Sequence, residues 1–137
     1  MASVADLCAP LVERMKSEVL ASKVIHTDDT QVKLIDKSLG STRLARFWGY
    51  LGDRQHPYAV DDFTEDRSRD GPQAFLKGYQ GYLQADAYGG YDGIYLSDGS
   101  DGTKRSSGVV EVACWTHCRR YWHKAREQDP KRAHHVL

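Results

Sequence analysis

The spacing of apolar positions predicts a helix at the start of the chain. Within residues 3–21, apolar side chains recur at intervals of three and four residues, as on one face of a helix. They are Leu7, Leu11, Val12, Met15 and Val19. Pro10 suits either a first helical turn or a kink, so the pattern leaves the start of this helix open.

Alternating and aromatic-rich runs follow, and they predict three strands. The runs cover residues 24–30, 44–51 and 58–63. The connections between them are short and contain Gly40 and the stretch "GDRQHP", which favours an antiparallel meander. The aromatic side chains of Phe47, Trp48 and Tyr50 are expected to pack in the core of this meander.

The second half of the chain mixes helical and strand patterns. In chain order, the expected elements are helical turns at 72–77, a strand at 82–86, a short helix at 88–96, a loop at 97–108, a strand at 109–114 and a helix at 116–128. Thr116 is the expected N-cap of the last helix. The apolar stripe of that helix consists of Cys118, Tyr121, Trp122 and Ala125.

This order of elements predicts an α/β fold. A meander followed by strand–helix–strand gives a mixed sheet of about five strands flanked by helices, preceded by the N-terminal helix. The strand–helix–strand unit between residues 82 and 114 should be parallel, because its connection is long enough to cross over the sheet.

Charge adds one feature to this picture. The 137 residues suit one domain, and 19 Lys and Arg residues balance 19 Asp and Glu residues, so the chain lacks an overall basic excess. The segment 119–132 is nevertheless basic. Arg119, Arg120 and Lys124 are therefore candidates for contacts with DNA phosphates, and a solvated helix face is the alternative.

The location of the protein can also be predicted from the sequence. No apolar run approaches the ~20 residues that cross a bilayer, and the first residues lack a secretory pattern, so no membrane partner is expected. The three cysteines are interpreted as free thiols in a reducing compartment. These features predict a cytoplasmic protein.

Carboxylates interrupt two of the predicted strands. Asp86 follows the apolar alternation of Leu83 and Ala85, and the first strand contains Asp28 and Asp29. If the two strands are neighbours, Asp28 and Asp86 meet and need a cation between them, for which oxygen ligands favour Mg²⁺ or Mn²⁺. Asp29 should point to the opposite face. The alternative is that Asp86 caps the next helix.

Four stretches resemble the transposases of the insertion sequence 66 family. They are "HTDDTQVKLID", "FWGYLGD", "DRSRDGPQAFLKGYQGYLQADAYGGYD" and "EVACWTHCRRYW", and they run from His26 to Trp122. The resemblance implies a DDE catalytic domain with a ribonuclease H-like fold. It implies an N-terminal helix at 1–22 and an incomplete ribonuclease H-like domain at 23–137.

The resemblance also implies roles for individual residues. Asp28 and Asp86 match the first two catalytic, metal-binding aspartates, with Mg²⁺ or Mn²⁺ as the cofactor. Asp29 stands where the family usually has glutamate. Cys114 and His117 match a Cys-x-x-His pair found in several groups of DDE transposases, and with Asp29 they are possible supports of the active site.

The implied activity is metal-dependent cleavage and transfer of DNA strands in transposition. The expected partners are the ends of an insertion sequence, target DNA and other transposase subunits, with the protein on the nucleoid when it is bound to DNA. The family's third carboxylate is a downstream glutamate that has no match here, so the chain resembles a fragment that is inactive alone. By spacing alone, Glu127 is another candidate for that third ligand.

Two other interpretations stay open at this point. The chain could be a non-catalytic remnant that keeps the fold and weak DNA binding. It could also be a small zinc-binding interaction module, since Cys114, His117 and Cys118 have ligand chemistry. Structural zinc requires four ligands, and His123, His134 and His135 are the candidates to complete such a set.

Overall fold

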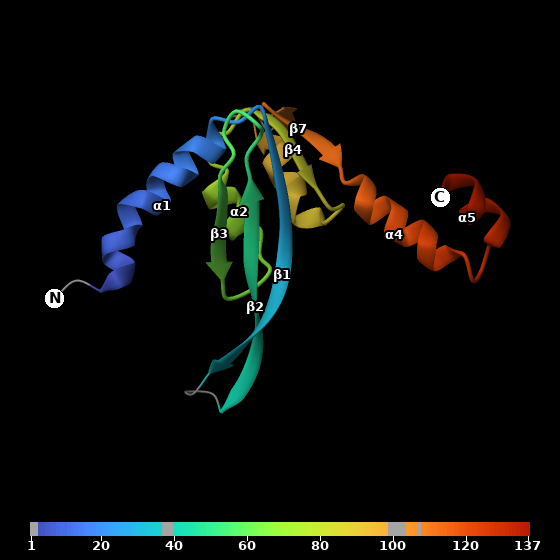
Figure 1. Ribbon diagram of the computed structural model, residues 1–137, viewed down its shortest axis with the longest axis horizontal. Helices are drawn as coiled ribbons and strands as arrows, with labels where there is room; N and C mark the ends of the chain where they lie inside the picture. Colours follow the sequence, from blue (N-terminus) through green and yellow to red (C-terminus); the bar gives the residue numbers. More distant parts are fainter. Residues whose placement is uncertain (1–2, 37–39, 99–103, 107) are drawn as a thin grey trace.

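The computed structural model describes residues 3–36, 40–98, 104–106 and 108–137 (Figure 1). In chain order the elements are α1 (Val4–Leu20), β1 (Val24–Asp36), β2 (Ser41–Leu51), β3 (Ala59–Thr64), α2 (Asp70–Phe75), β4 (Gly81–Ala85), the 3₁₀ turn η1 (Gly89–Tyr91), α3 (Asp92–Tyr95), β5 (Leu96–Asp98), β6 (Lys104–Ser106), β7 (Val109–Ala113), α4 (Trp115–Ala125) and α5 (Pro130–Val136). Among these described residues, no helix combines the length and apolar character needed to cross a bilayer.

Five strands form one mixed sheet in the order β3-β2-β1-β4-β7. β1, β2 and β3 pair antiparallel, whereas β4 lies parallel to both β1 and β7. The fold is therefore α/β with a five-stranded mixed sheet, flanking helices and an N-terminal helix, as the sequence predicts. This arrangement is consistent with the ribonuclease H-like fold. It places the carboxyl end of β4 beside the first half of the long β1 strand, with the end of β7 next to it on the other side of β4.

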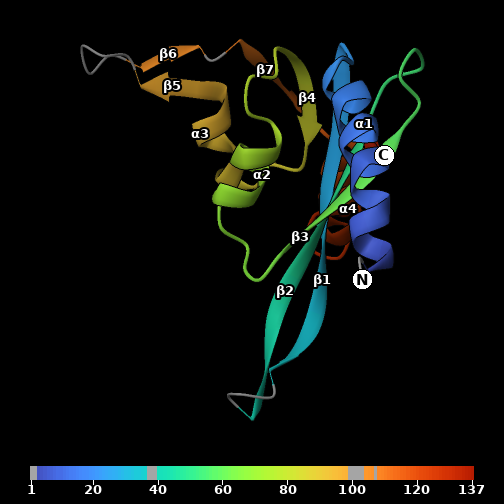
Figure 2. The ribbon, with the colours of Figure 1, turned by 90° about the vertical axis from the view of Figure 1, so that its left-hand side faces the viewer.

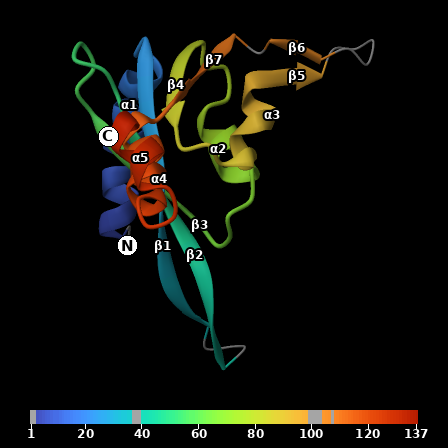
Figure 3. The same ribbon diagram turned by 90° about the vertical axis from the view of Figure 1, so that its right-hand side faces the viewer.

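One face of the sheet carries the hydrophobic core. Trp48, Tyr50, Ile25 and Leu83 are fully buried on this face, against the residues of α2, η1 and α3. Figures 2 and 3 show α2 and α3 together on the same side of the sheet. The ring of Tyr50 stacks on Phe75 of α2 with 3.6 Å between ring centroids, which ties the helix to the centre of the sheet.

The opposite face of the sheet remains largely exposed. Figure 1 looks onto this face, with α1 and α4 diverging to either side of it. It presents exposed apolar side chains, among them Phe47, Leu51, Tyr82 and Val110. The prediction that Phe47 packs in the core is therefore wrong: it is 45% exposed, because its neighbours Trp48 and Tyr50 point to the covered face.

The N-terminal helix forms as its pattern predicts but is packed only near its end. Ser3 and Asp6 make a capping box that satisfies backbone amides at the start of α1. Val19 in the last turn is buried in the core and Met15 packs against it, whereas Leu7 and Leu11 remain exposed. The apolar stripe thus anchors α1 to the sheet by its C-terminal turns.

The C-terminal part differs from the sequence prediction at several points. Residues predicted as a loop at 97–108 include most of the paired strands β5 and β6, whereas 99–103 and 107 lie outside the described residues. Cys114, not Thr116, is the N-cap of α4. Tyr121 is exposed, so the predicted stripe of α4 is not a core face, and α5 follows beyond the predicted end.

Candidate metal centre

The sheet register brings the two predicted aspartates together. His26 of β1 lies opposite Gln84 of β4, and continuing this parallel register by two residues puts Asp28 level with Asp86. In the same way, Ala85 lies opposite Ala113 of β7, so the next row contains Asp86 and Cys114. Three neighbouring parallel strands therefore contribute side chains to one row, at the level where β4 and β7 end.

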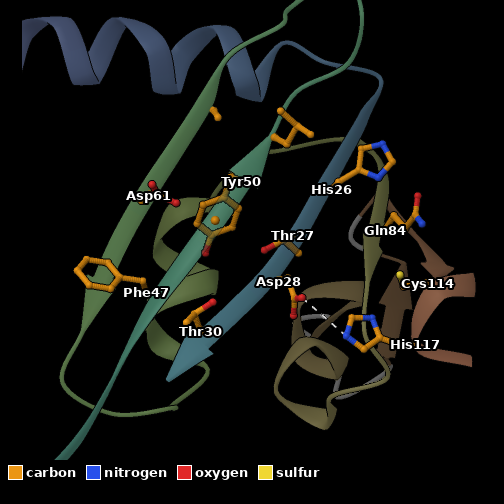
Figure 4. A pocket seen from close by; sticks show the side chains of 13 residues that line it. His26, Thr27, Asp28, Thr30, Phe47, Tyr50, Asp61, Gln84, Cys114 and His117 are labelled. Carbon is orange, nitrogen blue, oxygen red and sulfur yellow. Dashed lines mark ion pairs between the residues drawn. The ribbon is translucent and has the colours of Figure 1, made fainter. Parts of the chain in front are cut away.

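The first turn of α4 adds an imidazole to this row. Cys114 donates its backbone amide to the carbonyl of Ala85 at 3.0 Å, which fixes the start of the helix beside β4. His117, one turn later, then faces β1 with its Nε2 3.7 Å from Oδ2 of Asp28 (Figure 4). Ligand atoms of Asp28, Asp86 and His117 all lie within 4.8 Å of one another.

The three side chains differ in how much water they meet. Asp28 is 62% exposed and borders an open pocket of about 450 Å³ on the uncovered face of the sheet. Asp86 and His117 are largely covered. Oδ1 of Asp86 and Nδ1 of His117 are buried, and neither has a hydrogen-bond partner among the described residues.

A buried carboxylate oxygen without a partner is costly to leave unsatisfied. A cation among the three side chains would satisfy Asp86 and reduce the repulsion between the two carboxylates. The donor set of two carboxylates and one imidazole fits a divalent cation such as Mg²⁺ or Mn²⁺. The residues present therefore fit the metal that the sequence predicts.

Asp29 points away from this group, as the alternation of the strand predicts. Its side chain is only 2% exposed and lies on the covered face of the sheet. Arg46 of β2 donates to Oδ2 of Asp29 at 2.7 Å, and Arg67 donates to Oδ1 at 2.6 Å. Two arginines thus compensate the buried carboxylate of Asp29.

Arg67 also links Asp29 to Asp86 of the candidate metal centre. Its guanidinium lies 3.6 Å from Oδ2 of Asp86 and stacks at 3.8 Å over the ring of Tyr88. The hydrogen bonds to Asp29 raise the pKa of Arg67 above its ordinary value, so this cation is permanent. Tyr88 in turn donates its hydroxyl to the backbone carbonyl of Arg67 at 2.5 Å, which holds the loop in place.

Comparisons with known proteins identify the family of this chain. The family described as "Transposase IS66 family" matches residues 1–137. This chain belongs to the IS66 transposase family. The uncharacterized protein y4hP of Sinorhizobium fredii (strain NBRC 101917 / NGR234) is 27% identical over 117 residues, which are 81% of this chain and 20% of that protein. The uncharacterized protein y4qI of the same strain is 26% identical over 116 residues, 80% of this chain and 20% of that protein.

The chain therefore spans about one fifth of the length of these relatives.

Within the IS66 family match, the "Cys-Trp-Thr-His" stretch forms the junction between β7 and α4. Partial burial acts to raise the pKa of the Cys114 thiol, but the backbone amides of His117 and Thr116 and the adjacent imidazole of His117 outweigh it. Together they lower this pKa to about 7.

The other residues that the sequence suggests for the site lie outside the group of Asp28, Asp86 and His117. Arg119, Arg120 and Lys124 are exposed on α4, beside Trp115 and His123, around a hollow of about 440 Å³. Within the described part of the chain, none of the three basic side chains forms an ion pair with a carboxylate. Glu127 follows the end of α4 and is exposed, and the structure does not bring it into the group of Asp28, Asp86 and His117.

Sequence reasoning missed Arg67 as a residue of this site. It lies in the polar stretch "EDRSRD", 38 residues after Asp29, and no periodicity distinguishes it from Arg69. The available signal was a buried strand position occupied by Asp29, which required a cation from elsewhere in the chain.

Proposed function

We propose that this chain supplies the metal-binding catalytic core of an IS66-family transposase, which cleaves and transfers DNA strands in transposition. The observation that carries the proposal is the convergence of Asp28 and Asp86, from sequence-distant strands, with ligand atoms within 4.8 Å. Membership of a transposase family supports DNA as the substrate, namely the ends of an insertion sequence and a target. Assembly with further transposase subunits in the cytoplasm, on the nucleoid, belongs to the same proposal.

Asp28 and Asp86 hold the divalent cation in this proposal, Mg²⁺ or Mn²⁺. When bound, the cation supplies Lewis-acid activation of water and stabilises charge on the phosphate oxygens. In the first reaction, a water oxygen bonds to the scissile phosphorus, the bond from phosphorus to the 3′ oxygen breaks, and that oxygen takes a proton. In the second, the freed 3′ hydroxyl loses its proton and bonds to a target phosphorus, while the target's own 3′ oxygen leaves and is protonated.

The protein residues around the site hold the substrate and the carboxylates. Asp28 is exposed toward the open pocket, so a phosphate can approach it from the uncovered face of the sheet. Arg67 keeps the short segment after β4 in place through Asp86 and Tyr88. Arg119, Arg120 and Lys124 would bind phosphates that flank the scissile bond.

One observation favours a second candidate, a DNA-binding module without turnover. Arg67 already offers a positive charge 3.6 Å from Asp86, so a protein cation compensates part of the negative charge of the site.

A zinc-binding module has less support. Among the residues that the structure describes, the group able to hold a metal contains one imidazole and no thiol, whereas structural zinc sites use cysteine and histidine.

Metal binding tests the proposal directly. Asp28→Asn or Asp86→Asn should weaken Mn²⁺ binding at least about tenfold, because each variant loses a charged oxygen ligand. The measurement is a titration of free Mn²⁺ by electron paramagnetic resonance. Asp61→Asn is the matched control, since Asp61 is an exposed carboxylate beside the same pocket. Unchanged affinity in both Asp28→Asn and Asp86→Asn would rule out the proposed metal site.

DNA binding should depend on the basic face of α4. A triple alanine variant of Arg119, Arg120 and Lys124 should reduce the slope of log K against log salt by about 2.7, since each phosphate contact contributes about 0.9. Fluorescence anisotropy with labelled duplex DNA at several salt concentrations measures this slope. Alanine at three exposed basic residues outside α4 makes the charge-matched control; they are Lys33, Arg54 and Lys77. An equal loss of slope in both triple variants would show that α4 has no special part in binding.

A further inference from the structure

We infer that His117 is a third protein ligand of the metal and that it makes the site selective for Mn²⁺ over Mg²⁺. This inference rests on the proposed function, because Asp28 and Asp86 are taken as the other two ligands. It adds a residue from α4 to a site otherwise formed by strand positions. It also assigns a role to the histidine of the "Cys-Trp-Thr-His" stretch.

The distance between His117 and Asp28 fits a shared cation better than a direct bond. Nε2 of His117 lies 3.7 Å from Oδ2 of Asp28, which is too long for a hydrogen bond. Two ligands at about 2.1 Å from one ion can be separated by up to about 4.2 Å. The 3.7 Å separation lies within that limit. The ligand atoms of all three residues lie within 4.8 Å of one another, slightly beyond it, so Asp86 would have to move slightly to bind the same ion.

An ordinary ion pair explains the position of His117 poorly. Asp28 is 62% exposed, and a pair with such an exposed carboxylate contributes little to stability. His117 is nevertheless held firmly, because it lies in the first turn of α4, where Cys114 is bonded to Ala85 of β4. The fold thus positions Nε2 toward the carboxylates, where the 3.7 Å pair with exposed Asp28 is the ion pair that the described residues show for it.

The other imidazole nitrogen also fits the role of a ligand. A histidine that binds a metal through Nε2 carries its proton on Nδ1 and directs it to a neighbouring acceptor. Nδ1 of His117 is buried without a hydrogen bond of good geometry. The thiol of Cys114, whose pKa the adjacent imidazole of His117 lowers, would be that acceptor. A modest rotation on metal binding would orient the imidazole between the thiol and the ion.

An imidazole ligand changes which cation the site prefers. Mg²⁺ favours oxygen ligands and retains several waters, so a water replaces a missing histidine with little loss. Mn²⁺ also prefers oxygen ligands, but as a transition-metal ion it is softer than Mg²⁺ and gains more than Mg²⁺ does from a nitrogen ligand. Loss of His117 should therefore weaken Mn²⁺ binding much more than Mg²⁺ binding.

The test compares both metals and detects nitrogen ligation directly. Pulsed electron paramagnetic resonance of Mn²⁺ bound to the chain should show coupling to a histidine nitrogen, which changes on ¹⁵N-histidine labelling and disappears in His117→Gln. Titrations should show a Kd for Mn²⁺ at least about tenfold higher in His117→Gln and His117→Ala, with the Kd for Mg²⁺ changed less than about threefold. His26→Ala is the control, since His26 is an exposed histidine bordering the same pocket.

The outcomes separate this inference from the proposed function. If Asp28→Asn and Asp86→Asn weaken Mn²⁺ binding but the parent shows no histidine coupling, His117 is not a ligand and the carboxylate site stands. If coupling persists in His117→Gln and disappears in His26→Ala, the ligand is His26 and the inference is wrong. The presence of a histidine ligand is read on the unsubstituted chain, and circular dichroism of each variant distinguishes loss of the ligand from loss of the fold.

Discussion

The rate of DNA strand cleavage is expected to fall by at least about 10³-fold when Asp86 is replaced by asparagine. The substitution is made in a polypeptide that contains this chain and cleaves DNA. This loss corresponds to about 4 kcal/mol of transition-state stabilisation. Asparagine keeps the shape of the side chain but removes the charge that would hold the cation at the end of β4. Oδ1 of Asp86 is buried without a hydrogen-bond partner among the described residues, so water cannot easily replace the lost ligand there.

The measurement is a single-turnover cleavage rate with Mn²⁺ and DNA that carries the ends of the insertion sequence. Asp92→Asn is the matched control, because Asp92 is an exposed carboxylate a few residues later, at the start of α3. The control should cleave within about threefold of the parent rate. A parent-like rate for Asp86→Asn would show that this carboxylate takes no part in the chemistry.

The pairing of Asp28 with Asp86 could be predicted from the sequence because it depends on strand order and alternation. Once the strands of Asp28 and Asp86 are placed side by side and parallel, successive side chains alternate between the two faces of the sheet. This alternation determines that Asp28, and not Asp29, lies on the same face as Asp86. The same rule places Asp29 on the opposite face. Local sequence patterns were therefore sufficient to predict the relative positions of these aspartates.

Contacts made by loops could not be predicted in this way. Arg67 reaches Asp29 and Asp86 from an irregular segment, whose path depends on the packing of α2 and Tyr88. The exposure of Phe47 was also missed, since alternation distinguishes two faces of a strand without saying which face other elements cover. For the same reason, the exposure of Tyr121 could not be predicted from the apolar stripe of α4.

The β5–β6 hairpin shows a further limit of pattern reading. The stretch around it is rich in glycine, serine and aspartate, which favour turns over strands. The two strands have three residues each, too short for a period of two to be recognised. Residue preference therefore does not predict that these two strands pair.

Removing both arginines that contact Asp29 is expected to destabilise the fold by on the order of 3–5 kcal/mol. In Arg46→Met/Arg67→Met, the carboxylate of Asp29 would stay 2% exposed with no cation beside it, and a buried charge without a partner is strongly unfavourable. Each single variant should lose less, because one arginine remains. Methionine retains much of the apolar stem, so the loss reports mainly on charge.

Urea unfolding, followed by circular dichroism, measures the free energy of unfolding of these variants. Adding Asp29→Asn to the double variant supplies the decisive comparison, because it removes the uncompensated charge and should recover a large part of the lost stability. Arg43→Met/Arg69→Met is the control, since neither arginine contacts Asp29 in any ion pair that the described residues show. No recovery on adding Asp29→Asn would mean that the arginines stabilise the fold by packing. In that case the buried carboxylate of Asp29 would not be the reason that Arg67 lies beside the candidate metal centre.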